Sequence, residues 1–497
     1  MRRRRDSVGF VCGVVTVVAL LAPACATTPP APTRVWRSAP SEPWRQARPA
    51  PAPAVTSTSP TWQRFELRNG LTVLLLEEHT LPIVTASLAV RAGAALDGRD
   101  PGLAALTWSL LDQGMGELGA VDVAHAFGDL GAEAEVAVDA EWGAVSVRVH
   151  RDSLDKSVSL MSQMVRAPSF NAADVERVRK RHVAARLAAA GDPHDIAERT
   201  LLAELYGADH AYGHPANGTA SSLEKFKPSS VKRFWSEAAV PKNAALILVG
   251  DLTVDDARAL ADKHLGKWRG GAPKALKPPA PPASLARTKA RLVIVDRPDA
   301  PQTSIRIGKA MTSGLDPEFS TLVAVNLALA GLVSSRLDLS LREARGWTSG
   351  VESTLEPRLG PGPLVIAADV RTDVTADAID EILTQLASLR RDGVRADELA
   401  LVRAHVTRSR TALRTSSSSS PPLRAAAAFA LGVGPQREEE LAVAIDALTV
   451  DAVQAACERS MIVEGFVIVL VGDEDAIVAG LERKGLGDLI AAPSAGK

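Results

Sequence analysis

The chain repeats itself at a nearly constant distance. The strand-like runs 245–251 and 466–473 both end in Val-Gly-Asp, at Asp251 and Asp473. The acidic starts of two helical segments, Asp174 and Glu398, are separated by almost the same interval. So are Asp152 and Asp373, which both follow strand-like runs. Three nearly equal offsets predict a duplicated unit, so the chain should fold as two homologous halves.

Each half has the same coarse order of predicted elements: a strand hairpin, helices, strands and helices again. In the first half, Asn69-Gly70 separates two short apolar runs. This pair tolerates the positive φ angles of a two-residue turn, which predicts a hairpin. The alternation predicts an α+β fold in which each half has antiparallel sheets covered by helices on one face.

Two helices of the first half have recognisable start signals. Asp100-Pro101 is typical of a cap followed by a first-turn proline, and it predicts a helix over residues 102–115. Asn171 followed by Asp174 resembles a capping box and predicts a helix that runs to about Ala190.

Composition indicates an ordinary globular protein with several domains. The chain has 497 residues, of which 46% are hydrophobic and 23% charged, with a formal net charge of -1. Such a balance gives no electrostatic reason to expect a nucleic-acid partner. The predicted organisation, in chain order, is a signal peptide (1–24), a Pro/Ala-rich tether (25–62), an N-terminal domain (63–269), a Pro-rich linker (270–288), a C-terminal domain (289–480) and a tail (481–497).

The first residues predict export. Arg2–Arg5 are followed by the mostly apolar run 8–21 and then by Ala22-Pro23-Ala24 before Cys25. We expect a periplasmic or cell-envelope protein that is anchored to a membrane through lipid on Cys25. Simple secretion after Ala24 is the alternative. If Cys25 carries lipid, Cys457 has no disulfide partner and is expected in the core.

Several motifs of the two halves point to one known family. The second half contains Leu341-Arg342-Glu343-Ala344-Arg345-Gly346-Trp347 and Pro361-Gly362-Pro363-Leu364, and the first contains Tyr212-Gly213-His214-Pro215. Together these motifs resemble the insulinase/pitrilysin family of zinc peptidases. The resemblance extends over nearly all of 63–480. It implies two insulinase-like halves that form a clam-shell around a chamber for an extended peptide.

The zinc motif of that family is missing. Active members carry His-x-x-Glu-His on a helix, and the three places fall here on Ala105, Trp108 and Ser109. None of these side chains can bind zinc or take a proton from a metal-bound water. The family's third ligand would lie near residues 183–187, where there is no carboxylate. We predict that this chain binds no metal and that Trp108 is packed in the core.

The family's substrate-gripping pair is half present. The resemblance places the arginine at Arg342, but the tyrosine position that should follow it holds Ser349. Arg342 could hold a substrate carbonyl or carboxylate. Alternatively, it could pair with Asp338 or Glu343 or cover a helix end.

Other candidate sites are weaker. His210 and His214 have a spacing that would suit a metal on a helix, but Gly213 and Pro215 predict a loop without a third ligand. His194 and Glu198 are expected at a solvated helix start. The run Ser416–Ser420 has no paired base and predicts a loop rather than a nucleophile.

These observations predict a non-catalytic insulinase-family homologue that is the partner subunit of a zinc-bearing homologue, resembling the companion subunit of mitochondrial processing peptidase. Zinc is then expected only in the partner, with an extended peptide as substrate. A stand-alone peptide-binding or scaffold lipoprotein is the alternative, and an independently active zinc metallopeptidase is a minor one.

Overall fold

The computed structural model describes residues 61–273, 277–287, 289–415 and 420–486. Cys25, the predicted signal peptide, nearly all of the tether, Ser416–Ser419 and the end of the tail lie outside the described residues. The described residues belong to one compact unit. The predicted domain boundaries remain predictions.

A six-stranded sheet forms the base of the N-terminal half, in the order β1-β2-β8-β3-β7-β6. Its strands are β1 (Trp62–Glu66), β2 (Thr72–Glu77), β3 (Ile83–Val90), β6 (Ala134–Val138), β7 (Gly143–His150) and β8 (Ala244–Gly250). All neighbouring strands are antiparallel except β2 and β8, which are parallel. A separate two-stranded sheet pairs β4 (Gly114–Met115) with β5 (Leu118–Gly119).

The C-terminal half repeats this topology with five strands in the order β11-β12-β10-β13-β9. Its strands are β9 (Arg291–Asp296), β10 (Gln302–Ser313), β11 (Val351–Leu355), β12 (Pro361–Arg371) and β13 (Val467–Gly472). Only β9 and β13 are parallel. Each strand therefore has a counterpart in the first half, with β13 matching β8 as the sequence offset predicts, and the prediction of two homologous halves is confirmed. The parallel pair in each sheet was not predicted.

The helices follow the same duplication. Those of the first half are α2 (Leu103–Trp108), α3 (Ala120–Gly128), α4 (Leu154–Arg166), α5 (Ala172–Ala189), α6 (Pro193–Tyr206), α7 (Ala220–Leu223), α8 (Pro228–Ala238) and α9 (Val254–Leu265). Those of the second half are α10 (Phe319–Asn326), α11 (Thr375–Asp392), α12 (Ala396–Thr415), α13 (Ser420–Leu431), α14 (Arg437–Asp446), α15 (Val450–Ser460) and α16 (Glu474–Arg483), with two π-helical segments, Leu327–Gly331 and Asp338–Ala344. Among the described helices, none is both long and apolar enough to cross a bilayer.

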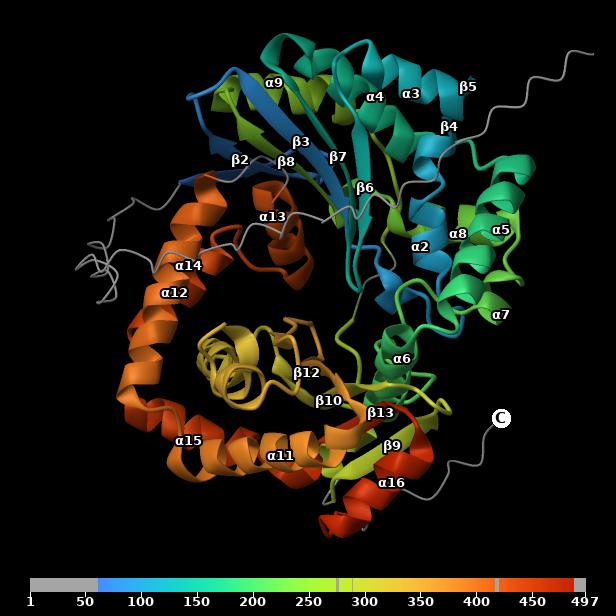
Figure 1. Ribbon diagram of the computed structural model, residues 1–497. Helices are drawn as coiled ribbons and strands as arrows, with labels where there is room; N and C mark the ends of the chain where they lie inside the picture. Colours follow the sequence, from blue (N-terminus) through green and yellow to red (C-terminus); the bar gives the residue numbers. More distant parts are fainter. Residues whose placement is uncertain (1–60, 274–276, 288, 416–419, 487–497) are drawn as a thin grey trace, which may run out of the picture. The chain divides into compact units, whose positions relative to one another are not determined.

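Both faces of each sheet are covered. On one face of the N-terminal sheet lie α4 and α9, and on the other lies α13, which belongs by sequence to the second half (Figure 1). In α13, Phe429 and neighbouring alanines pack on Leu74, Ala89 and Ile247 of this sheet. The prediction of helices on one face only was therefore incomplete.

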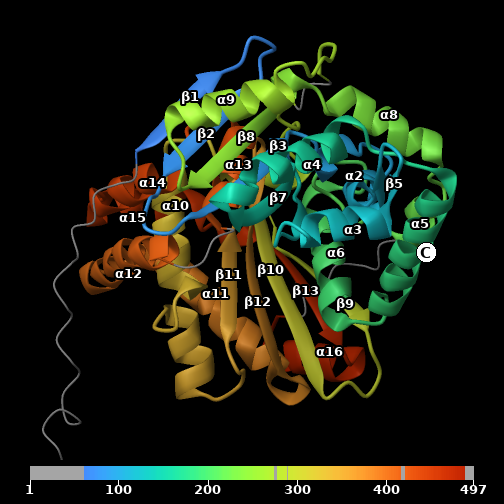
Figure 2. The ribbon, with the colours of Figure 1, turned by 90° about the horizontal axis from the view of Figure 1, so that it is seen from above.

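The exchange is reciprocal. Helix α6, from the first half, packs on β10 and β13 of the second, as Figures 1 and 2 show. Ile196, Leu201 and Leu205 contact Val467 and its strand neighbours in one buried cluster. Each half thus supplies a helix that covers one face of the other half's sheet.

A buried polar network joins the two halves beside this exchange. Glu141 is 3% exposed and accepts hydrogen bonds from the Tyr212 hydroxyl at 2.5 Å and from the backbone N–H of Leu359 at 2.6 Å. Burial raises the pKa of Glu141. The guanidinium of Arg358 lies 2.9 Å from Asp139, which adds an ion pair across the same boundary. A separate bond runs from the Tyr206 hydroxyl to the carbonyl of Pro361 at 2.9 Å.

The first hairpin differs from its prediction. Pairing of β1 with β2 ends at Glu66 and Thr72, so the connection is longer than the two-residue turn that was predicted. The side chain of Asn69 explains the wider loop, because its Nδ2 donates to the carbonyls of Leu265, the last residue of α9, and of Trp268 just after it. Gly70 does adopt the expected positive φ, at +85°.

Helix α2 also differs from its prediction. It ends at Trp108, whereas the sequence predicted helix to residue 115. The hydroxyls of Thr107 and Ser109 donate to backbone carbonyls one turn earlier, a pattern that bends and weakens a helix. Asp100 does not cap it. Instead Asp97, which is 5% exposed, accepts from the N–H groups of Gly102 and Ala104 at 2.8 and 2.7 Å.

We predict that Asp97→Ala lowers the free energy of unfolding by about 2 kcal/mol, because it removes a helix cap and leaves two buried donors unpaired. Asp100→Ala is the matched control and should change it by less than about 0.5 kcal/mol, since Asp100 is exposed. Urea unfolding of the two variants measures both values. Equal losses would contradict the assignment of Asp97 as the cap.

Candidate functional site

The three positions of the missing zinc motif lie at the end of α2, and Trp108 dominates them. Its side chain is 0% exposed, and its indole Nε1 donates to the carbonyl of Ala92 at 2.7 Å. Its ring meets that of Trp235 edge to face, with centroids 5.0 Å apart. The prediction that Trp108 is a packed core residue is confirmed.

The indole also lies directly on the backbone of β7. A Cβ atom placed on Gly143 would come within 2.2 Å of Cε2 of Trp108, closer than real atoms approach. Residue 143 must therefore be glycine while the Trp108 ring holds this position. A large apolar ring, held by one hydrogen bond and a fitted backbone, occupies the helix position where the family motif has its glutamate.

The other two motif positions are equally unable to bind metal. Ala105 is 2% exposed and has only a methyl group. The hydroxyl of Ser109 is already engaged, because Oγ donates to the carbonyl of Ala105 at 2.8 Å.

The helix expected to supply a third ligand, α5, contacts α2 as the resemblance implies. Over residues 183–187 it carries no carboxylate. Val183 packs against the N-terminal core, and Nη2 of Arg186 lies 2.6 Å from both carboxylate oxygens of Asp195 on α6. Across the described residues, no group of three or more His, Cys, Asp or Glu side chains could hold a metal ion.

A cavity of about 760 Å³ lies in the C-terminal half and brings together Arg342 and Ser349, the two positions singled out by the sequence. Arg342 is paired: Nη2 lies 2.8 Å from Oδ2 of Asp338 and 2.8 Å from Oε1 of Glu343. Asp338 is 3% exposed, so Arg342 neutralises a buried charge. Its side chain is still 29% exposed and lines the cavity.

One wall of this cavity is an edge of the C-terminal sheet. Among the described strands, β11 pairs with β12 alone, and its residues Val351–Thr354 line the cavity. His194 also lines the cavity, and its Nδ1 lies 3.0 Å from Nη2 of Arg306 on β10. His194 does lie at a helix start, as predicted. Its position in the cavity was missed, because that depends on the packing of α6 against the opposite half.

The remaining histidine pair forms no site. His210 and His214 lie in the connection after α6, as the glycine and proline residues predict. His210 contacts the carbonyl of Ala280 through Nε2 at 2.9 Å and stacks on Tyr206. His214 is buried, and burial lowers its pKa.

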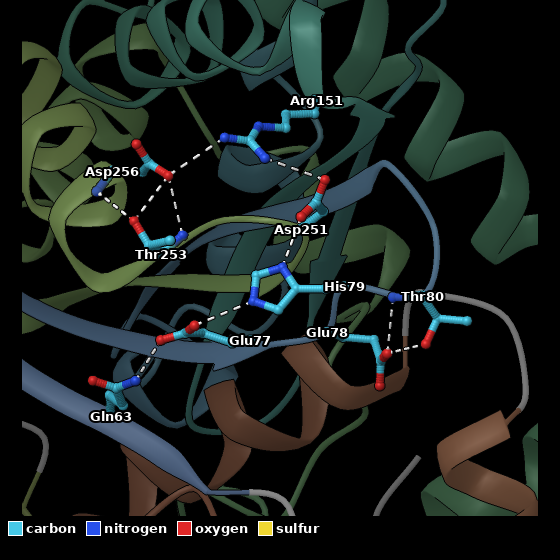
Figure 3. Close-up of polar contacts among 9 residues, drawn as sticks. All are labelled: Gln63, Glu77, Glu78, His79, Thr80, Arg151, Asp251, Thr253 and Asp256. Atoms are coloured by element: carbon cyan, nitrogen blue, oxygen red, sulfur yellow. Dashed lines mark hydrogen bonds and ion pairs between the residues drawn. The ribbon is translucent and has the colours of Figure 1, made fainter.

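An exposed polar cluster at the ends of β2 and β8 resembles a catalytic arrangement only superficially (Figure 3). His79 contacts Asp251 at 2.7 Å and Glu77 at 3.3 Å, one through each ring nitrogen. The hydrogen bond to Asp251 raises the pKa of His79. The hydroxyls of Thr80 and Thr253 are bonded to carboxylates of their own turns rather than to the imidazole. The cluster is therefore an ion-pair network without an activated nucleophile.

The comparisons with known proteins agree with this geometry. Residues 72–217 match the family described as insulinase (peptidase family M16), and residues 225–406 match the peptidase M16 inactive domain. An uncharacterized zinc protease of Mycobacterium tuberculosis is 29% identical over 367 residues, which cover 72% of this chain and 80% of that protein. A non-peptidase homolog of Helicobacter pylori is 28% identical over 184 residues, covering 37% of this chain and 42% of that protein.

Solved structures show the same fold. The peptidase M16 inactive domain from Pseudomonas fluorescens superposes with a TM-score of 0.76 at 26% identity, covering 83% of this chain and 98% of that chain. The first half of the periplasmic protease PqqL from Escherichia coli has a TM-score of 0.67 at 17% identity, covering 87% and 98%.

Fold and site together define a peptidase-like protein of two homologous halves whose zinc motif has been replaced. The chain belongs to the insulinase (M16) family.

We predict that Gly143→Ala destabilises the protein by about 1–3 kcal/mol, because the added methyl group overlaps the Trp108 ring. Gly128→Ala, at a helix end where a Cβ would meet nothing within 4 Å, is the control and should be neutral or stabilising. Thermal unfolding of both variants measures the difference.

Trp108→Leu provides the coupling test. If the indole is what Gly143 accommodates, the double variant should lose less stability than the sum of the single losses. Strict additivity would show that the clash lies elsewhere.

Proposed function

We propose that this protein is a non-catalytic subunit that binds an extended peptide and works with a zinc-bearing homologue of the same family. The observation that carries the proposal is Trp108. A buried indole at the position of the catalytic carboxylate supplies no base and leaves no space for a reactive water. The peptidase-like framework around it is retained, which suits binding without hydrolysis.

The cavity beside β11 supports a peptide-binding role. An edge strand offers backbone N–H and C=O groups that can pair with an added strand, and neighbouring pockets then select side chains. Here His194, Arg306 and Arg342 line the same cavity as Val351–Thr354. We infer that the backbone of an extended peptide pairs along β11 and that Arg342 holds a carbonyl or carboxylate of that peptide.

The location of the protein belongs to the same proposal. Export and lipid attachment at Cys25 rest on the N-terminal sequence, where arginines, an apolar run and a small-residue site precede the cysteine. The periplasmic protease PqqL shares the fold. We propose a cell-envelope protein in which residues 25–62 tether the folded unit to a membrane and zinc is held by the partner.

The direct test is co-expression with a zinc-bearing insulinase-family homologue from the same genome. The two chains should co-purify, the complex should cleave a quenched fluorescent peptide, and this chain alone should contain less than about 0.1 zinc per molecule. Mutating the glutamate in the partner's zinc motif to glutamine is the control, and it should abolish cleavage by the complex.

Three outcomes would decide against the proposal. A stable complex with no activity would remove the catalytic partnership, and the absence of any complex would favour a stand-alone peptide-binding lipoprotein. One tightly bound zinc in the isolated chain, together with chelator-sensitive cleavage, would make it an independent peptidase.

For Arg342 we predict that Arg342→Lys weakens peptide binding by about fivefold, because an ammonium cannot reproduce the planar fork of a guanidinium but still neutralises Asp338. Arg345→Lys is the matched control: Arg345 lies nearby in the sequence, pairs with Glu381 and does not line the cavity. Calorimetric titration with a non-cleaved peptide measures both. Equal affinities for the two variants would remove Arg342 from the site.

A further inference from the structure

A second cavity, of about 700 Å³, lies among the helices of the N-terminal half and shares no lining residue with the cavity beside β11. One of its lining residues, Trp235, packs edge to face on Trp108 at the zinc-motif position. The cavity is bounded by the end of α4 and the segment after it, by α8, and by the residues that follow α9. Helices α4 and α9 pack against each other on one face of the sheet, as Figures 1 and 2 show.

The floor of this cavity is aromatic. Phe170, Trp235 and Trp268 all line it, and each is between 4 and 5% exposed. The indole Nε1 of Trp235 donates to the carbonyl of Val165 at 2.8 Å, which fixes that ring. Phe170 has a positive φ of +41°, a conformation that costs energy for a residue with a Cβ atom.

The rim is cationic. Arg166, Lys232, Lys267 and Arg269 line the cavity and all four are exposed. None of the described residues that line it is acidic. Arg166 donates to the backbone carbonyl of His264 at 2.8 Å. Among the described residues, none of these four cations forms an ion pair. Four positively charged side chains around an apolar floor are complementary to a ligand that is both anionic and apolar.

The duplicated half provides an internal comparison. Helices α8 and α15 begin at Pro228 and Val450, which are separated by the same offset as Asp251 and Asp473. A cavity of about 820 Å³ lies beside α11 and α15 in the second half.

The charge of this second-half cavity is different. It contains Arg390 and Arg391, but it also contains Glu458 and Glu464. Glu458 is the counterpart, at the same offset, of Ser236, which lines the first cavity. The same place in the fold is therefore of mixed charge in one half and purely cationic in the other.

We propose that the cavity lined by Phe170, Trp235 and Trp268 binds an acidic peptide segment, with an apolar side chain on the aromatic floor and flanking carboxylates on the four cations. The cations come from three separate elements and lie on exposed side chains. This arrangement suits several anionic groups spread along a chain better than one small anion, which would need buried, fixed donors. A flat membrane surface cannot reach a floor whose rings are almost completely buried, whereas a projecting side chain can.

The test uses the full chain carrying Cys25→Ser, so that lipid at this position does not contribute to vesicle binding. The probe is fluorescently labelled acetyl-Glu-Glu-Phe-Glu-Glu-amide, followed by anisotropy at low and at physiological salt. Binding is expected, and it should weaken as salt rises because the rim charges are exposed. Replacing the central Phe by Gly should lower affinity about tenfold, through loss of the apolar contact.

The pocket variant is Lys232→Glu with Lys267→Glu, which we expect to weaken binding about tenfold or more. Its matched control is Arg390→Glu with Arg391→Glu, an equal change of net charge at the equivalent cavity, which should change affinity less than about twofold. All substituted side chains are exposed, and melting curves check that both variants fold.

Several results would overturn the proposal. These are no binding to the unsubstituted chain at millimolar peptide, equal losses in the two charge-reversal variants, or equal affinity for the Phe and Gly peptides. Vesicles containing phosphatidylglycerol are the remaining comparison. If they bind in a manner that depends on Lys232 and Lys267 while the peptide does not bind, the occupant is a membrane surface rather than a peptide.

Discussion

The structure depends on the reciprocal burial of α6 and α13. A twisted sheet with one face exposed leaves a row of apolar side chains in water, and each β-sheet here closes that face with a helix encoded in the other half of the chain. The exchange accounts for the single compact unit formed by the described residues despite an internally duplicated sequence. It also implies that neither half would be stable alone, because each would expose the surface that the missing helix covers.

The polar contacts at this boundary add specificity to that apolar burial. Glu141 accepts hydrogen bonds from both the Tyr212 hydroxyl and the backbone N–H of Leu359. Arg91 donates to the carbonyl of Phe429 at 2.7 Å, and its guanidinium lies 3.9 Å from the centre of that ring. Buried hydrogen-bonded groups stabilise one arrangement over others, since any shift leaves donors and acceptors unpaired. The cavity beside β11 depends on the same arrangement of the two halves, because His194, which lines the cavity, belongs to α6 of the first half.

The sequence predicted features that depend on local chemistry or on repetition. The duplication, the α+β class, the Asn171 cap, the core positions of Trp108 and Cys457, and the loop around His210 all agree with the structure. It did not predict features that depend on distant partners. The conformation of the loop at Asn69 depends on hydrogen bonds from its side chain to carbonyls near the end of the same half. Asp97 caps α2 from a preceding turn that no sequence pattern indicates. The exchange of α6 and α13 was not predictable because amphipathic spacing reports that a helix is buried, not which sheet buries it.

The contact between Trp108 and Gly143 makes the loss of the metal motif hard to reverse. Restoring two histidines and a glutamate on α2 would place a carboxylate in a space fitted to an indole, with no third ligand on α5 to gain from it. A glutamate at position 108 would therefore reduce stability before any metal could bind. The packing that fills the site thus opposes the return of the metal motif by single substitutions at this position.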